Sequence, residues 1–134
     1  MAGSGDPVEI WVNPACSKCR AATAALDAAG IEYVERRYLV EPPTSAELED
    51  VLARLRLEPW DVARSAETRA AGIDLPREAA HRAAWIDAMV ARPEVIQRPI
   101  ITSTDGTAVV ARDDATLADV VAAERPAHQP GQPR

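Results

Sequence analysis

Two cysteines three positions apart, Cys16 and Cys19, form the most reactive motif of this sequence. They lie in the segment NPACSKCR, residues 13–20, which follows a short apolar run and precedes an alanine-rich stretch. This pattern predicts a strand over 8–12 and a helix that begins with Ser17 as its N-cap. A thiol at the first turn of a helix faces unpaired backbone N–H groups and the positive end of the helix dipole, and both favour the thiolate. We therefore expect Cys16 to be a nucleophile with a lowered pKa, in a loop that can also bind an oxyanion.

Two other interpretations of the cysteine pair remain open. Cys16 and Cys19 could be half-buried small hydrophobic residues without chemistry. They could also belong to a zinc site, but structural zinc takes four ligands and the chain adds only His81 and His128. The Cys-x-x-Cys spacing at a strand–helix junction favours redox chemistry over both, and we expect no metal.

The composition fits one ordinary domain and limits the classes of function. A chain of 134 residues can bury a core, and 47% hydrophobic with 27% charged residues is normal for a soluble protein. The net charge of −6 argues against binding to nucleic acids or to anionic membranes. The sequence shows neither a signal peptide nor an apolar run long enough for a membrane helix. Two cysteines without an export signal indicate a reducing, cytoplasmic compartment, and we expect a monomer.

The order of predicted elements is strand, helix, strand, then a helical region, then a hairpin and a last helix. The predicted strands are 8–12, 31–39, 99–102 and 108–110, and the predicted helices are 17–29, one beginning at 44 or 45, 77–91 and 114–124. The first strand–helix–strand unit implies a parallel pair, and Asp105-Gly106 predicts a hairpin turn. We therefore predict an α/β fold with thioredoxin-like topology, in which helices flank a four-stranded mixed sheet.

The same reading divides the chain and assigns buried faces. Residues 1–6 are predicted to be a flexible leader, 7–124 the domain, with a helical insertion over about 42–97, and 125–134 a disordered tail. Thr44-Ser45-Ala46-Glu47 has the spacing of a capping box. The residues predicted to face the core from helices are Leu48, Val51, Leu52, Leu55, Ala80, Ala84, Trp85, Ala88, Met89, Leu117, Val120 and Val121.

Four segments together resemble a known family. The motif NPxCSxxR at 13–20 resembles the N-terminal signature of the glutaredoxin-coupled arsenate reductases. The segments YLxxPPT at 38–44, WDVAR at 60–64 and RPII at 98–101 fall in the order and spacing of that family. The resemblance covers residues 8–124. The family is also similar in sequence to thiol-switch transcription regulators that bind RNA polymerase.

The resemblance implies a set of site residues. In the arsenate reductases the motif cysteine attacks arsenate and three arginines hold the oxyanion. Carried over by position, the nucleophile is Cys16 and two of the arginines are Arg64 and Arg98. Strict spacing puts the third at Ala111, whereas one extra residue in the strand puts it at Arg112, which we adopt. Each arginine could instead be a solvated surface residue.

The remaining candidates support the nucleophile. We expect Asn13 to shape the loop, Arg20 to keep Cys16 ionised, and Ser17 and Pro99 to line the substrate site. The resemblance also implies a cis Arg98–Pro99 peptide, with Pro99 facing the cysteine.

Cys19 departs from the family, which usually has serine at this position. After Cys16 attacks arsenate, either Cys19 or a small external thiol would attack its sulfur and release arsenite. A glutaredoxin- or thioredoxin-type protein would then restore the thiols, so the resemblance implies an external reductant and no bound cofactor. The alternative function is a redox-switch regulator in which a Cys16–Cys19 disulfide controls binding to RNA polymerase. The three arginines favour the enzyme, and the cysteine pair favours the switch or an enzyme with its own resolving thiol.

Overall fold

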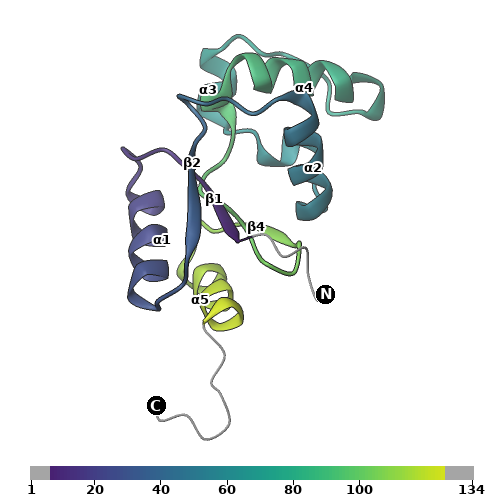
Figure 1. Ribbon diagram of the computed structural model, residues 1–134. Coiled ribbons are helices and arrows are strands. Elements are labelled where there is room, and N and C mark those ends of the chain that lie inside the picture. Colours follow the sequence, from purple (N-terminus) through teal and green to yellow (C-terminus); the bar gives the residue numbers. More distant parts are fainter. Residues whose placement is uncertain (1–6, 126–134) are drawn as a thin grey trace, which may run out of the picture.

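A four-stranded mixed sheet forms the centre of the molecule. The computed structural model describes residues 7–125 (Figure 1), so the predicted leader and residues 126–134 of the predicted tail lie outside the described part. The strands are β1 (Val8–Val12), β2 (Tyr33–Arg37), β3 (Ile100–Thr102) and β4 (Ala108–Val110). Their order is β2-β1-β3-β4, with β1 and β2 parallel and the other two pairs antiparallel. This is the predicted mixed sheet.

Helices cover both faces of this sheet. They are α1 (Ser17–Ala28), α2 (Ser45–Leu55), α3 (Ser65–Ala70), α4 (Arg82–Ala91) and α5 (Asp114–Glu124), with short 3-10 turns η1 (Pro59–Val62), η2 (Ala79–His81) and η3 (Pro93–Val95). Figure 1 shows α1 and α5 on one side and α2, α3 and α4 grouped on the other. None of the helices in the described range 7–125 has the length and apolar character needed to cross a membrane.

Alternation along the central strand builds two separate cores. Ile10 and Val12 point toward α1 and α5 and pack with Ala22 and Leu26. Trp11 points to the opposite face. There it joins a larger cluster with side chains of α2 and α4 that includes Leu48, Leu52, Trp85 and Met89. The central strands β1 and β3 are therefore largely buried on both faces, whereas β2 is largely exposed.

The capping box of α2 forms as predicted and ties this helix to β2. The backbone N–H of Glu47 donates to Thr44 Oγ1 at 3.1 Å, and the N–H of Thr44 donates to Glu47 Oε1 at 2.9 Å. The Glu47 carboxylate also pairs with Arg36 of β2 at 2.8 Å. The Arg36 guanidinium and the cap N–H lower the pKa of Glu47 to about 2.

The second strand is shorter than the predicted 31–39. It ends at Arg37 because the backbone N–H groups of Val40 and Glu41 both bond to the carbonyl of Arg37 and turn the chain. Tyr38 follows the strand with its side chain fully buried. The first helix differs by one residue, since Cys16 and not Ser17 is its N-cap.

The helical region differs most from the prediction. The helix expected over 77–91 begins at Arg82, after the 3-10 turn η2, because Trp85 Nε1 donates to the carbonyl of Pro76 at 2.9 Å and folds the preceding segment back. Trp85 and Met89 are buried as expected, but Ala80 and Ala84 are exposed and Ile86 takes the inward position. Helix α3 was not predicted. The hairpin and α5 match the prediction, and Val120 is buried.

Candidate active site

The sheet topology brings the sequence candidates to one edge. The cysteine loop follows β1 and Tyr38 follows β2, and these two strands are parallel. Strand β3 runs antiparallel to β1, so Arg98, which precedes β3, lies at the same edge. Strand β4 returns antiparallel to β3, so Arg112 follows it there as well. Four chain segments that are distant in the sequence therefore meet around Cys16.

Asn13 shapes the loop, as predicted. Its Oδ1 accepts the backbone N–H of Ala15 at 3.0 Å, and its carbonyl accepts the N–H of Cys16 at 2.8 Å. Its own N–H points at Cys19 Sγ, 3.4 Å away. One residue thus fixes the turn that carries the first cysteine and contacts the sulfur of the second.

The pKa of Cys16 is lowered to about 7. Partial burial raises the pKa, but the backbone N–H groups of Cys19 and Lys18 in the first helical turn lower it more, and the Arg98 guanidinium adds to their effect. The start of the helix therefore lowers the pKa of Cys16, as expected. The cation that contributes to this effect is Arg98, whereas we had predicted Arg20. The Cys16 thiolate is therefore far more accessible near neutral pH than that of a free cysteine.

Cys19 has the opposite character. It is 1% exposed, and both cysteines are free thiols. Burial and the neighbouring charge of Cys16 together raise the pKa of Cys19 to about 11, against the lowering effect of the Asn13 N–H. At neutral pH the site therefore combines a reactive Cys16 thiolate with a protonated Cys19 thiol.

Arg64 and Arg98 lie close together beside this pair. Two backbone hydrogen bonds pair the segment that carries Arg64 with the segment before Arg98. The backbone N–H of Arg64 donates to the carbonyl of Val95 at 2.7 Å, and the backbone N–H of Gln97 donates to the carbonyl of Val62 at 2.8 Å. The positive charges of both arginines lower the pKa of Glu67 and act on Tyr38. The structure thus brings these two predicted arginines together.

The two guanidinium groups differ in how their Nε–H donors are used. Arg98 Nη1 reaches the carbonyl of Glu94 at 3.4 Å, while its Nε is buried without a hydrogen-bond partner. Arg64 Nε is buried as well and makes no regular hydrogen bond, but it is ion-paired with Glu67 Oε2 at 3.2 Å. Because buried donors are almost always paired in folded proteins, the Arg98 Nε–H group is a candidate donor to an anionic ligand.

Arg112, and not Ala111, carries a cation at this edge. Ala111 is 3% exposed, and its backbone N–H donates to the carbonyl of Pro99 at 2.9 Å. Arg112 Nη1 donates to the carbonyl of Arg98 at 2.7 Å. The Arg98–Pro99 peptide between these contacts is cis, as predicted, and Pro99 is buried.

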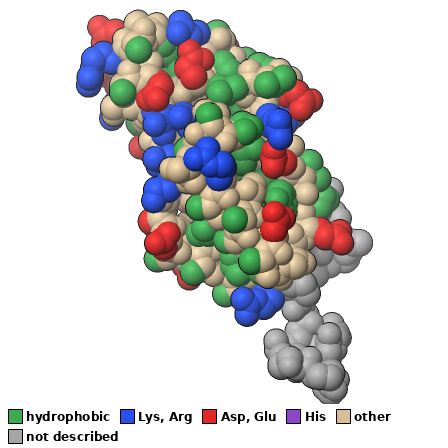
Figure 2. All heavy atoms as spheres, turned by 90° about the vertical axis from the view of Figure 1, so that its left-hand side faces the viewer, with side chains coloured by type: hydrophobic (Ala, Val, Ile, Leu, Met, Phe, Trp, Pro, Cys, Tyr) green, Lys and Arg blue, Asp and Glu red, His purple; other side chains and the backbone are tan. Residues whose placement is uncertain are grey.

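Ser17 and Arg20 lie at the rim of the loop. Ser17 is exposed and makes no capping hydrogen bond. Arg20 Nη1 donates to the carbonyl of Pro14 at 3.0 Å and braces the loop. Figure 2 shows a band of Lys and Arg side chains across the middle of the face that carries α1, although the chain as a whole is acidic.

Two residues of the site were not predicted from the sequence. Tyr38 donates its hydroxyl proton to the carbonyl of Ile96 at 3.2 Å. It lies within the arginine cluster formed by Arg64 and Arg98, whose charges both act on it. Glu67 pairs with Arg64 from one turn along α3. The segment YLxxPPT could have indicated Tyr38, and the i, i+3 spacing could have indicated Glu67, had α3 been recognised.

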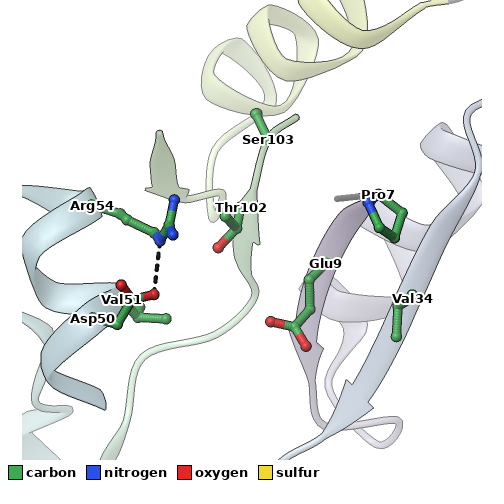
Figure 3. A pocket seen from close by; sticks show the side chains of 8 residues that line it. All are labelled: Pro7, Glu9, Val34, Asp50, Val51, Arg54, Thr102 and Ser103. Atoms are coloured by element: carbon green, nitrogen blue, oxygen red, sulfur yellow. Dashed lines mark hydrogen bonds and ion pairs between the residues drawn. The ribbon is translucent and has the colours of Figure 1, made fainter. Parts of the chain in front are cut away.

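Of two further cavities, one lies away from the cysteines and the other borders Cys19. The cavity in Figure 3, of about 310 Å³, lies at the opposite edge of the sheet, where Glu9 faces α2 and Arg54 is bound to Asp50 at 2.8 Å. A smaller cavity of about 190 Å³ between α1 and β2 includes Cys19 and Arg20 in its lining. Over residues 7–125, the His, Cys, Asp and Glu side chains form no group that could hold a metal ion.

Comparison with known proteins connects this geometry to one family. Residues 11–120 match the ArsC family. The chain is 50% identical over 117 residues to an uncharacterized protein of the glnII region of Streptomyces viridochromogenes, covering 85% of this chain and 98% of that protein. It is 33% identical to an arsenate reductase of Rhizobium meliloti, covering 82% and 79%. It is 25% identical to the global transcriptional regulator Spx 1 of Lactococcus lactis, covering 72% and 76%.

A solved structure shows the same fold. An arsenate reductase from Vibrio cholerae superposes with a TM-score of 0.75 at 28% identity, covering 90% of this chain and 99% of that one. The predicted thioredoxin-like topology is therefore confirmed.

Proposed function

Because the chain belongs to the ArsC family, we propose that it is a thiol-dependent oxidoreductase that reduces arsenate to arsenite. The observation that carries this proposal is the buried, unpartnered Nε–H group of Arg98 beside a cysteine whose pKa is about 7, with the guanidinium of Arg64, ion-paired to Glu67, close by. An oxyanion between the guanidinium groups would use the Arg98 donor and meet the thiolate.

The first step joins Cys16 to arsenic. The Cys16 thiolate attacks the arsenic atom, a sulfur–arsenic bond forms, and one arsenate oxygen leaves as water after taking up protons. Negative charge on both reactants would oppose this approach. Arg64, Arg98 and Arg112 neutralise the oxyanion with planar, paired donors and stabilise the charge on its oxygens as the bond forms.

The second step reduces arsenic. A second thiolate attacks the sulfur of Cys16, and the electron pair of the sulfur–arsenic bond stays on arsenic. Arsenic(V) becomes arsenic(III) and leaves as arsenite, while the two sulfurs form a disulfide. We assign this thiol to Cys19, with a small external thiol as the alternative. A glutaredoxin- or thioredoxin-type dithiol then reduces the disulfide, which suits a cytoplasmic location.

An assay with arsenate and different thiol donors tests the proposal. The wild type should form arsenite with at least one donor system. Cys16→Ser should be inactive with every donor because the nucleophile is absent. If Cys16→Ser turned over arsenate as fast as the wild type does, Cys16 would be excluded as the nucleophile.

A redox-switch regulator is the second candidate. The similarity to the regulator Spx 1 and the two free thiols on one helical turn favour it. In this alternative a reversible Cys16–Cys19 disulfide would change the binding of a protein partner such as RNA polymerase. A wild-type protein that forms this disulfide reversibly, binds RNA polymerase in only one redox state and produces no arsenite would favour the regulator over the reductase.

A further inference from the structure

Tyr38 occupies a central position in the arginine cluster that the proposed chemistry does not yet use. Its side chain is 0% exposed, and its ring stacks on Trp11 with centroids 6.3 Å apart. Its hydroxyl donates to the carbonyl of Ile96 at 3.2 Å. A phenol has one proton to donate, so the Tyr38 oxygen can only accept from its other neighbours.

The arginine next to this hydroxyl is Arg98. Ile96, which accepts the Tyr38 proton, lies two residues before Arg98, so the hydrogen bond fixes the backbone that leads into this arginine. The Arg98 guanidinium also interacts electrostatically with both the Tyr38 hydroxyl and the Cys16 sulfur. Tyr38 therefore acts on the base of the arginine side chain and on its charged group.

The ionisation of Tyr38 agrees with this arrangement. Burial raises the pKa of Tyr38 to about 12, against the opposing effect of the Arg98 charge. The phenol is therefore neutral at physiological pH and cannot act as a base. It offers Arg98 the negative end of a fixed dipole without neutralising its charge.

We propose that Tyr38 is a positioning residue that holds the Arg98 guanidinium against Cys16, and thereby sets the ionisation of the nucleophile and the affinity of the site for oxyanions. The part that concerns oxyanions rests on the proposed function. The part that concerns the Cys16 thiolate stands without it, because ionisation can be measured in the absence of arsenate.

The test is the pH dependence of Cys16 alkylation by iodoacetamide in Tyr38→Phe. This variant keeps the ring that stacks on Trp11 and removes only the hydroxyl. The midpoint should rise by roughly half a unit to one unit, because a mispositioned Arg98 stabilises the thiolate less. The matched control is Tyr33→Phe, which removes an exposed hydroxyl bonded to Asp27 and should leave the midpoint unchanged.

A double substitution separates positioning from general damage to the fold. In an Arg98→Gln background, Tyr38→Phe should cause no further rise in the Cys16 midpoint, since Tyr38 acts through Arg98. An equal rise in both backgrounds would overturn the proposal, and so would an unchanged midpoint in Tyr38→Phe. Sulfate protection of Cys16 against alkylation should weaken about tenfold in Tyr38→Phe, as expected for a loss near 1.4 kcal/mol.

A second measurement applies if Tyr38→Phe does not fold. The ring carbon resonances of Tyr38 should shift in Arg98→Gln while those of Tyr33 stay in place, because only Tyr38 contacts Arg98. Unchanged Tyr38 resonances would contradict the contact. A wild type that fails to reduce arsenate would remove the proposed function, yet both of these measurements would still decide the role of Tyr38.

Discussion

Arg112 Nη1 donates to the carbonyl oxygen of Arg98 at 2.7 Å and links the end of β4 to the start of β3. This bond places the Arg112 guanidinium next to the backbone of Arg98. Ala111 is committed to the core beside α5, whereas the longer side chain of Arg112 reaches back across the edge of the sheet. Two arginines of the site are therefore structurally dependent on each other.

Arg112→Ala should weaken oxyanion binding more than the removal of an arginine far from the site. It removes a guanidinium and leaves the Arg98 carbonyl without its donor, so we expect the Kd for sulfate or arsenate to rise roughly tenfold or more. Isothermal titration calorimetry measures this change. Arg77→Ala, at an exposed position on the loop before η2, is the control and should bind as the wild type does. Equal affinities in the two variants would exclude Arg112 from the site.

Arg98→Lys should keep the fold and lose most of the oxyanion affinity. A lysine places a single point charge where the guanidinium offers a planar set of donors, and it cannot supply the buried Nε–H group. Circular dichroism reports the fold, and calorimetry with sulfate reports the affinity. An affinity equal to that of the wild type would show that Arg98 serves only as a charge.

Cys16 should titrate well below a free cysteine. Its alkylation rate should rise with pH, reach half of its maximum near pH 7 and level off above that, since only the thiolate reacts. The measurement is alkylation of the Cys19→Ser variant, which leaves one thiol. A midpoint at or above about 8.5, the value of an unperturbed cysteine, would contradict the lowered pKa.

Cys19 should be the resolving thiol despite its high pKa. Cys19 lies one helical turn from the sulfur it must attack, and this proximity gives it a high effective concentration over any external thiol. The arginines that hold the oxyanion offset the negative charge that the bound arsenate brings to the site. Cys19→Ser should lose turnover with thioredoxin-type donors and keep some with a small thiol and glutaredoxin.

Mass spectrometry checks the same prediction without a mutation. After one turnover the wild type should have lost two hydrogens and carry no thiol adduct. Full activity of Cys19→Ser with every donor would instead leave Cys19 as a packing residue.

The Glu47 carboxylate should contribute to stability in a pH-dependent way. Its pKa is lowered from 4.5 to about 2, so its contribution is fully present above pH 4.5 and is lost as the pH falls toward 2. The side chain is 43% exposed, and solvent screening limits the effect of Glu47→Gln to about 1 kcal/mol. Urea unfolding should show this loss at pH 7 and little difference between variant and wild type near pH 2. Glu35→Gln, in the exposed pair with Arg37, is the control.

Local patterns in the sequence determined the elements and the reactive loop. A short apolar run predicted the strand around Trp11, alternation predicted the strand that follows α1, the capping box predicted the start of α2, and Asp105-Gly106 predicted the hairpin. Each of these signals lies within a few residues of chain. The start of the long helix before Trp85 was placed wrongly. There the chain forms the 3-10 turn η2 before α4, and Trp85 Nε1 donates to the carbonyl of Pro76, a contact that no local pattern indicated.

The constellation around Cys16 was decided only by the tertiary structure. The sequence supplied the cysteine spacing and, through resemblance, the candidate arginines, but it gave no sign that Tyr38 contacts Arg98 or that Ile96 accepts its proton. The Tyr38–Ile96 hydrogen bond joins residues 58 positions apart. Both contacts exist because the strand order β2-β1-β3-β4 brings the end of β2 and the start of β3 to the same edge of the sheet. Strand order depends on burying both faces of the sheet at once, and no short stretch of residues encodes it.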